Sequence, residues 1–315
     1  MTSRTTDLLL TAIAPAVWGS TYIVTTELLP ANYPLTVALL RALPAGLLLM
    51  LIVRQLPPRA WWGRILLLGA LNFSVLWAML FLAAYRLPGG VAATITSVQP
   101  LFVVFLAGLL LGAPVRALSV AAAVIGMGGV ALLVLTPNAT LDALGLAAAL
   151  AAAVSMAFGT VLSRRWQPPV SALTFTAWQL TAGGLLLLPV ALWLEPPLPA
   201  LTAMNWVGFA WLGLVGAALT YIVWFRGVAR LEPSAIAPLA FLSPVTAVIL
   251  GWALLGQSLS GWQMAGIGIV IASIWLSQQA QRGAQPVRAA LPCARSRPGA
   301  AAGGAPSAAP SRAGW

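Results

Sequence analysis

Ten apolar segments, each long enough to cross a lipid bilayer, follow one another along this chain. A membrane-spanning helix needs about 20 mostly apolar residues. Only 7% of the residues are charged, whereas a soluble domain carries about 25%. We therefore predict an all-α integral membrane protein with ten transmembrane helices, at residues 7–27, 34–54, 64–85, 91–112, 116–135, 141–163, 171–194, 205–226, 234–256 and 261–281.

Turn-forming residues such as Pro57-Pro58, Pro88-Gly89-Gly90 and Pro196-Pro197 separate these segments. The first segment is too long for the core of a signal peptide and begins a series of similar segments, so we interpret it as a retained span. From about residue 283 onward the chain consists mainly of Ala, Pro, Gly, Ser and Arg. Such a segment cannot bury a core, and we expect it to be disordered.

The chain contains an internal repeat. Residues 86–132 resemble residues 230–276 at a shift of 144 positions, with twelve of 47 pairs identical, where about four are expected by chance in so Leu- and Ala-rich a chain. A second match, Ala45-Gly46-Leu47 with Gly183-Gly184-Leu185, has a shift of 138 and sets Arg41 opposite Gln179. The predicted units are residues 1–137 and 138–282, each with five helices, followed by the tail at 283–315.

The Arg residues predict the orientation of the helices, because loops on the cytoplasmic side are enriched in positive charge. With both termini in the cytoplasm, the outer loops hold only Arg86. The inner loops and leading segment hold nine, namely Arg4, Arg54, Arg59, Arg64, Arg116, Arg164, Arg165, Arg226 and Arg230. Five helices is an odd number, so the two repeats are expected to lie inverted in the membrane, which is typical of secondary transporters.

Composition argues against several other functions. The chain has no His, and its one Cys, Cys293, lies in the tail, so we expect no metal site, disulfide framework or cofactor. No nucleophile-and-base pair, phosphate loop or ion-channel filter is recognisable, so neither an enzyme nor a channel is predicted. The net charge of +11 comes from Arg residues, most of which are scattered at span ends, and this indicates membrane orientation rather than nucleic-acid binding.

No acidic residue lies in the middle of a predicted span. The five acids are at span ends or in loops, at Asp7, Glu27, Asp142, Glu195 and Glu232. Proton-driven carriers usually bury an acid or a His as the proton relay. The sequence therefore favours a facilitator or exchanger over a carrier coupled to protons through a deep carboxylate.

Arg41 is the principal candidate for substrate binding. It lies about seven residues into the second span, roughly 10 Å below the outer edge of the membrane. A charged side chain at that depth normally faces a partner or a wet cavity, and its guanidinium would bind a substrate carboxylate through two hydrogen bonds. The alternative is that Arg41 extends to the outer headgroups or pairs with Glu27.

Aromatic and amide side chains within other spans are further candidates to line the site. They would hold an apolar body and hydrogen-bond a polar head. The alternatives are an interfacial aromatic belt for Trp224 and Trp62, and contacts between helices for the amides. The predicted substrate-binding residues are Trp18, Tyr22, Arg41, Asn72, Trp77, Gln99, Trp178, Gln179 and Tyr221.

Pro100 and Pro244 occupy equivalent positions inside the fourth and ninth spans. A Pro within a helix removes a backbone hydrogen bond and bends the helix. Paired bends would suit two gating helices, although static kinks explain the same pattern. Gly108, Gly112, Gly126, Gly128, Gly129, Gly266 and Gly268 are interpreted as sites of close helix packing.

Several of these motifs resemble the EamA repeat. In the first half they are Trp18-Gly19-Ser20-Thr21-Tyr22, Leu40-Arg41, Leu71-Asn72-Phe73 and Gln99-Pro100-Leu101 through Leu111-Gly112. In the second half they are Tyr221-Ile222-Val223-Trp224-Phe225, Pro233-Ser234-Ala235 and Ser243-Pro244-Val245 through Leu255-Gly256. Their order over about residues 7–281 is similar to that of the ten-span drug/metabolite transporter superfamily.

This resemblance implies an inner-membrane carrier with inverted five-helix repeats around a central cavity. Members of the family export amino acids, pigments and other small metabolites by alternating access, and this chain looks closest to bacterial members linked with aromatic amino acid or pigment efflux. Many relatives carry Glu where this chain has Ala113 and Gln257.

We thus expect a multi-pass bacterial inner-membrane exporter of small metabolites, with amino acids, possibly aromatic ones, as the leading class. The expected partners are a small-molecule substrate and the lipid bilayer, without nucleic acid, and the protein is expected to be a monomer or a weak homo-oligomer. The alternative is a flippase for lipid-linked substrates or a membrane partner protein.

Overall fold

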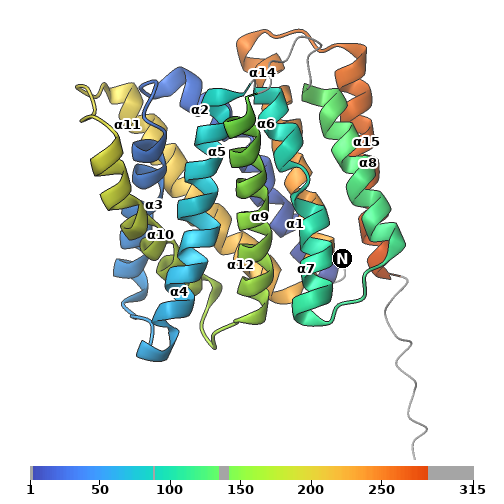
Figure 1. The fold of residues 1–315 in the computed structure, drawn as a ribbon, viewed down its shortest axis with the longest axis horizontal. Coiled ribbons are helices and arrows are strands. Elements are labelled where there is room, and N and C mark those ends of the chain that lie inside the picture. The colour runs from blue at the N-terminus through green and yellow to red at the C-terminus, as the bar shows by residue number, and fades with distance from the viewer. Residues whose placement is uncertain (1–2, 88, 135–141, 283–315) are drawn as a thin grey trace, which may run out of the picture. The chain divides into compact units, whose positions relative to one another are not determined.

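The computed structural model of the chain describes residues 3–87, 89–134 and 142–282. Within these ranges all regular structure is helical and no strand occurs, which confirms the all-α prediction (Figure 1). The predicted boundary between the two repeats and the predicted tail lie outside the described residues.

The first half of the chain contains α1 Ser3–Trp18, α2 Ser20–Leu28, α3 Pro34–Val53, η1 Arg59–Trp61, α4 Trp62–Gly69, η2 Ala70–Ser74, α5 Val75–Arg86, α6 Gly89–Thr96, α7 Gln99–Leu111 and α8 Ala117–Val134. The second half contains α9 Ala143–Arg165, α10 Ala172–Leu194, α11 Ala203–Ala210, η3 Trp211–Leu219, α12 Thr220–Arg230, α13 Pro233–Ile236, η4 Ala237–Phe241, α14 Leu242–Leu255 and α15 Gly261–Arg282.

Nine helical stretches within the described residues are long and apolar enough to cross a membrane. Several of them join consecutive elements, such as α1 with α2 and α11 with η3 and α12. They correspond in order to the first nine predicted spans. The tenth predicted span forms α15, which has 22 residues but carries several Gln residues, and it is not among the nine.

Helices α3 and α10 pack side by side (Figure 1), and their contact repeats itself in reverse. A Cβ atom on Gly46 would lie 2.6 Å from the backbone nitrogen of Thr181. A Cβ atom on Gly184 would lie 2.7 Å from Cα of Leu43. Under the sequence shift of 138, position 46 maps onto 184 and position 43 onto 181. The two helices therefore exchange equivalent contacts, which is expected when they run antiparallel about a local two-fold axis.

Helices α8 and α15 form a second pair of this kind, also adjacent in Figure 1. A Cβ atom on Gly126 would lie 2.7 Å from Oγ of Ser273, and one on Gly129 would lie 3.0 Å from the nitrogen of Val270. Under the shift of 144, position 126 maps onto 270 and position 129 onto 273. Because Gly126 and Gly129 have no side chain, the backbones of the two helices approach closely at both contacts.

Backbone irregularities also recur at equivalent positions. The π-helix η2 in the third span has its counterpart in the π-helix η3 of the eighth. Gly112 and Gly256, which are 144 positions apart, end α7 and α14 with φ of 67° and 65°. This left-handed backbone conformation carries no steric cost in Gly, which is why Gly is common directly after a helix.

The fourth span is interrupted just before its Pro residue, and the ninth changes there from a 3₁₀ helix to an α-helix. Residues 97 and 98 separate α6 from α7, and Pro100 is the second residue of α7. In the ninth span the 3₁₀ helix η4 precedes α14, and Pro244 is the third residue of α14. Both Pro residues lie inside the spans predicted to hold them. Each follows closely on a change of helix, where the missing N–H has fewer intrahelical acceptors to lose.

Contacts between loops define one end of the bundle, which we call the Glu195 end. The Glu195 carboxylate accepts hydrogen bonds from the backbone nitrogens of Leu35 and Thr36 at 2.6 and 2.7 Å. The backbone nitrogen of Asn32 donates to the Tyr85 hydroxyl at 3.1 Å. The start of α3 and the ends of α5 and α10 therefore lie together.

The opposite end of the bundle, which we call the Asp7 end, is held together by an ion-pair cluster, and the eighth span connects the two ends. Near the Glu195 end, Asn205 at the start of α11 donates to the Leu28 carbonyl at 2.8 Å. The span of α11, η3 and α12 then runs through 28 residues to the other end. There, Asp7 of α1 pairs with Arg226 at 2.7 Å and with Arg230 at 3.3 Å.

Candidate functional site

A cavity of about 540 Å³ lies among α2, α3, α5, the α6–α7 break, α9, α12 and α14. It extends from Leu29, Ala31 and Tyr85 near the Glu195 end to Arg41 and Tyr221 deep in the bundle. Its volume is within the range of about 300–1,000 Å³ that is usual for small-molecule sites. Its polar lining residues include Thr21, Tyr22, Thr25, Thr26, Arg41, Tyr85, Thr96, Ser97, Gln99, Tyr221 and Ser243.

The cavity brings together six of the nine residues predicted from sequence. Aromatic and polar side chains from five different spans meet there, although they are as many as 203 positions apart. Both candidate gating prolines also line it. The six are Trp18, Tyr22, Arg41, Trp77, Gln99 and Tyr221.

Arg41 is buried, with 3% of its surface exposed. Its Nη2 donates to the Gly216 carbonyl oxygen at 2.8 Å, and its Cζ lies 4.5 Å from the centre of the Trp77 ring. Its Nε is buried without a hydrogen-bond partner. The ion pairs of the described residues do not include Arg41, so it does not pair with Glu27 there, and its burial argues against extension to the headgroups.

The π-helix η3 explains how a mid-span carbonyl can bind Arg41. A π-helix shifts the backbone hydrogen bonds from i→i+4 to i→i+5, which locally changes where its carbonyls point. The Gly216 carbonyl accepts from Arg41 and also from the Thr220 hydroxyl at 2.9 Å. Thr220 in turn accepts from Nε1 of Trp18 at 2.9 Å. This chain of contacts links α1, α12, η3 and α3 directly beside the cavity.

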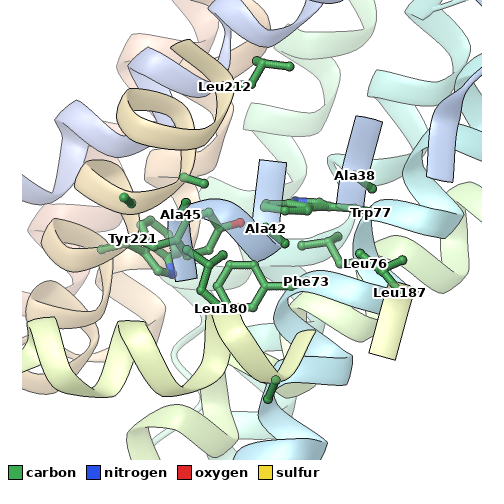
Figure 2. Packing of buried hydrophobic residues seen from close by; sticks show 14 of the residues in the cluster. Ala38, Ala42, Ala45, Phe73, Leu76, Trp77, Leu180, Leu187, Leu212 and Tyr221 are labelled. Carbon is green, nitrogen blue, oxygen red and sulfur yellow. The ribbon is translucent and has the colours of Figure 1, made fainter. Parts of the chain in front are cut away.

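Aromatic rings form the deep wall of the cavity. The ring centre of Tyr221 lies 4.9 Å from that of Trp18, 4.6 Å from that of Phe73 and 6.1 Å from that of Trp77. Figure 2 shows Tyr221, Phe73 and Trp77 in the packed layer near Ala42 of α3. Ring pairs at such distances stabilise packing and keep the rings oriented.

Several polar atoms beside the cavity have no hydrogen-bond partner. They are Nε of Arg41, both amide atoms of Gln99 and the hydroxyl of Thr25. A buried polar group without a partner costs about 1–3 kcal/mol, so such groups normally meet a ligand or water. Among the described residues that line the cavity, Arg41 is the one fixed charge, and none is acidic. The cavity is therefore suited to an anionic group.

Asn72, Gln179 and Trp178 lie outside the cavity lining. Nδ2 of Asn72 donates to Oε1 of Gln179 at 2.8 Å and to Oγ of Ser163 at 3.2 Å. Nε1 of Trp178 donates to the carbonyl of Gln55 at 2.6 Å. The amides join α10 to η2 and α9, which is the packing alternative stated for them above.

The contact between the two amides is related by the internal repeat to the contact of Arg41 with Gly216. Position 41 maps onto 179 at the shift of 138, and position 72 maps onto 216 at the shift of 144. The contact between Asn72 and Gln179 is thus the counterpart of the contact between Gly216 and Arg41. One half of the molecule carries the charge at this place and the other half carries a neutral amide.

The aromatic-belt interpretation, stated for Trp224 and Trp62, does not hold for Trp224. Trp224 is 1% exposed and its ring lies 5.2 Å from that of Trp18, so it belongs to the core. Trp62 is 54% exposed, as a belt residue would be.

The sequence reasoning missed the hydroxyl-bearing residues of the lining. Thr21 and Thr25 each follow an aromatic residue, Trp18 and Tyr22, by three positions, and the two Thr residues are four apart, so all four share one helix face. That spacing was a usable signal. Thr96, Ser97 and Ser243 offered none, because they line the cavity where α6 ends and where η4 passes into α14. Within the described residues no group of three His, Cys, Asp or Glu side chains could hold a metal ion.

A protein-family model and several known proteins match most of this chain. The model of the EamA-like transporter family matches residues 5–135 and again residues 143–278. Protein PecM of Dickeya dadantii is 46% identical over 84% of this chain and 90% of its own length. The inner membrane transporter YedA of Escherichia coli K12 is 30% identical over 82% of this chain and 86% of its own length.

A solved crystal structure has the same fold. It covers 90% of this chain, and all of that structure is matched, with a TM-score of 0.77 and 21% sequence identity.

Proposed function

Since this chain belongs to the EamA-like transporter family and is therefore a membrane transporter, we propose that it exports small amphipathic metabolites from the cell. Amino acids are the leading class, with aromatic ones among them. The observation that carries this proposal is a buried guanidinium at an otherwise largely apolar and aromatic cavity, without a carboxylate partner among the described residues.

Arg41 is the proposed site for the substrate carboxylate. Nη2 is occupied by the Gly216 carbonyl, which fixes the side chain, while Nε is free of a partner. Charge-assisted hydrogen bonds from Arg to a carboxylate are among the strongest in proteins. An isolated buried charge is costly, so binding an anion at Arg41 would lower the free energy of the site.

The other five of the six predicted residues that line the cavity would hold the rest of the substrate. Trp18, Tyr22, Trp77 and Tyr221 offer ring faces and edges for an apolar or planar body. Gln99 offers an amide for a second polar group. Asn72, Trp178 and Gln179 are not part of this proposal, because they lie outside the lining.

Transport is proposed to proceed by alternating access between inverted repeats, with α15 as the tenth span and both termini in the cytoplasm. The reversed contacts within the α3–α10 and α8–α15 pairs support this arrangement, as does the family match to each half. In the proposed orientation the Glu195 end faces outward in the bacterial inner membrane. The cavity, whose lining extends to that end, then opens to the outside.

Pro100 and Pro244 are proposed to take part in gating. Both line the cavity within three residues of a helix start, α7 for Pro100 and α14 for Pro244. A helix start has fewer intrahelical hydrogen bonds than a helix interior, so the chain can pivot there at a lower cost.

The proposal is tested by replacing Arg41 with Ala and measuring phenylalanine uptake into proteoliposomes. Loss of a charged hydrogen bond costs about 1.5–3 kcal/mol, so uptake at subsaturating substrate is expected to fall at least about tenfold. Arg59→Ala, at an exposed residue outside the cavity, is the matched control and should retain the wild-type rate.

Unchanged uptake by Arg41→Ala would contradict the assigned role. Faster lipid-headgroup exchange without any solute flux would instead favour the flippase alternative.

A further inference from the structure

We propose that Gln99 is the residue that recognises the ammonium group of an amino acid, and so separates amino acids from carboxylates that lack one. This inference rests on the proposed function, because it assumes that Arg41 binds the carboxylate.

Gln99 is built into the cavity wall. It is the first residue of α7, directly after the break that ends α6. It is 3% exposed and lines the cavity, yet neither Oε1 nor Nε2 has a hydrogen-bond partner. A buried amide without partners is destabilising, so a cavity ligand that hydrogen-bonds to both amide atoms would stabilise Gln99 at this place.

The charges of the cavity determine what that ligand group is. With Arg41 as the one fixed charge among the described lining residues, a substrate carboxylate has an ionic partner and an ammonium group has none. An ammonium group has three N–H donors and no acceptor. It must therefore be met by neutral oxygen atoms.

Among those oxygens, Oε1 of Gln99 and the hydroxyl of Thr25 are both buried without a hydrogen-bond partner. The amide oxygen is the purely accepting one of the two, since a hydroxyl also carries a proton to donate. The neighbouring Thr96 hydroxyl donates to the carbonyls of Ala92 and Ala93, and the Ser97 hydroxyl donates to the carbonyl of Thr94. Both hydroxyls are thereby fixed toward α6. Gln99 has no such constraint and can orient its amide oxygen toward a ligand.

The inference predicts a change in specificity rather than a general loss of binding. Replacing Gln99 with Leu removes the acceptor but keeps a side chain of similar bulk. Phenylalanine should then bind at least about tenfold more weakly, since a hydrogen bond to a charged group is lost. Binding of 3-phenylpropionate, which has the same ring and carboxylate but no ammonium group, should stay within about twofold.

The experiment measures binding of these two compounds and of phenethylamine to the purified full-length protein by calorimetry. The variants are wild type, Gln99→Leu and, as a control, Gln257→Leu at an exposed amide outside the cavity. The wild type is expected to bind both carboxylates and to bind phenethylamine poorly. Gln257→Leu should bind as the wild type does.

Equal weakening of both carboxylates by Gln99→Leu, or no weakening of phenylalanine, would overturn the role of Gln99 and leave the Arg41 site standing. Failure of the wild type to bind either carboxylate would overturn the proposed function itself. A thermal melt of Gln99→Leu checks the fold, and no loss of stability is expected, because the amide atoms make no hydrogen bond.

Discussion

Replacing Asn72 with Leu is expected to lower the thermal stability of the protein and to leave substrate binding unchanged. Leu has a branched shape similar to that of Asn, so the change removes hydrogen bonds with little change in volume. Two hydrogen bonds are lost, from Nδ2 to Gln179 at 2.8 Å and to Ser163 at 3.2 Å. Gln179 is fully buried, and its Oε1 is left with the Ser163 hydroxyl at 3.5 Å.

The magnitude follows from that remaining contact. A buried acceptor that loses its partner costs about 1–3 kcal/mol. Hydrogen bonds between membrane helices measure lower, about 0.6 kcal/mol on average and up to about 1.7. We therefore expect a loss of about 1–2 kcal/mol. In a protein of this size each kcal/mol corresponds to about 2–4 °C in melting temperature.

A double-mutant cycle makes the measurement specific. Gln179→Met removes the other amide, and the combined variant leaves the Ser163 hydroxyl but neither amide unsatisfied. Its cost should therefore be smaller than the sum of the two single costs by about 0.5 kcal/mol or more. Melting in detergent and phenylalanine affinity are measured for all four proteins.

The refuting result is the reverse pattern. If Asn72→Leu melted like the wild type but lost affinity for the substrate, the two amides would belong to the binding site, as the sequence suggested, and not to the packing between α10, η2 and α9.

The remaining predictions concern packing and charge. Gly266→Val in the α8–α15 contact is expected to lower stability by about 1–3 kcal/mol, because a Cβ there would lie 2.8 Å from a backbone oxygen of α8. Gly268→Val is the control. A Cβ at that position meets no atom within 4 Å, so this variant should melt like the wild type. Asp7→Asn removes a charge that is 8% exposed but leaves partly exposed Arg partners, so it should cost about 1.5–3 kcal/mol, as for a hydrogen bond to a charged group. Asp142→Asn, in a half-exposed pair at 3.7 Å, should cost less than about 1 kcal/mol, and similar melting of the two variants would contradict this. Trp178→Phe loses one hydrogen bond to a loop carbonyl, so melting should fall by about 0.5–1.5 kcal/mol in equivalent stability while phenylalanine affinity stays the same.

The helices of the fold were readable from the sequence, because lipid imposes a simple requirement. A segment of about 20 apolar residues that crosses a bilayer as a helix satisfies its backbone internally, so apolar length and turn residues located the spans. The breaks within spans were less visible. Pro100 suggested a bend, but the break precedes it, at residues 97 and 98. The π-helix η3 has no residue signature that would have predicted it.

The sequence predicted which types of residue would form the site, but not which residues would contact one another there. Arg41 stood out because a charge within a span requires an explanation, and its burial and its place in the cavity lining agree with that expectation. Its actual partner, the Gly216 carbonyl, depends on η3 and could not be inferred from residue types.

The sequence by itself determined that this chain is a helical membrane protein with a duplicated pattern, since hydropathy and repeat similarity are properties of residue order. It also supplied three amides within apolar helices, Asn72, Gln99 and Gln179, that look alike in their local sequence. Only the tertiary structure decided between them. Packing turned Asn72 and Gln179 toward each other and left Gln99 beside the cavity without a partner, because the role of a buried polar group depends on what the neighbouring helices bring within hydrogen-bond distance.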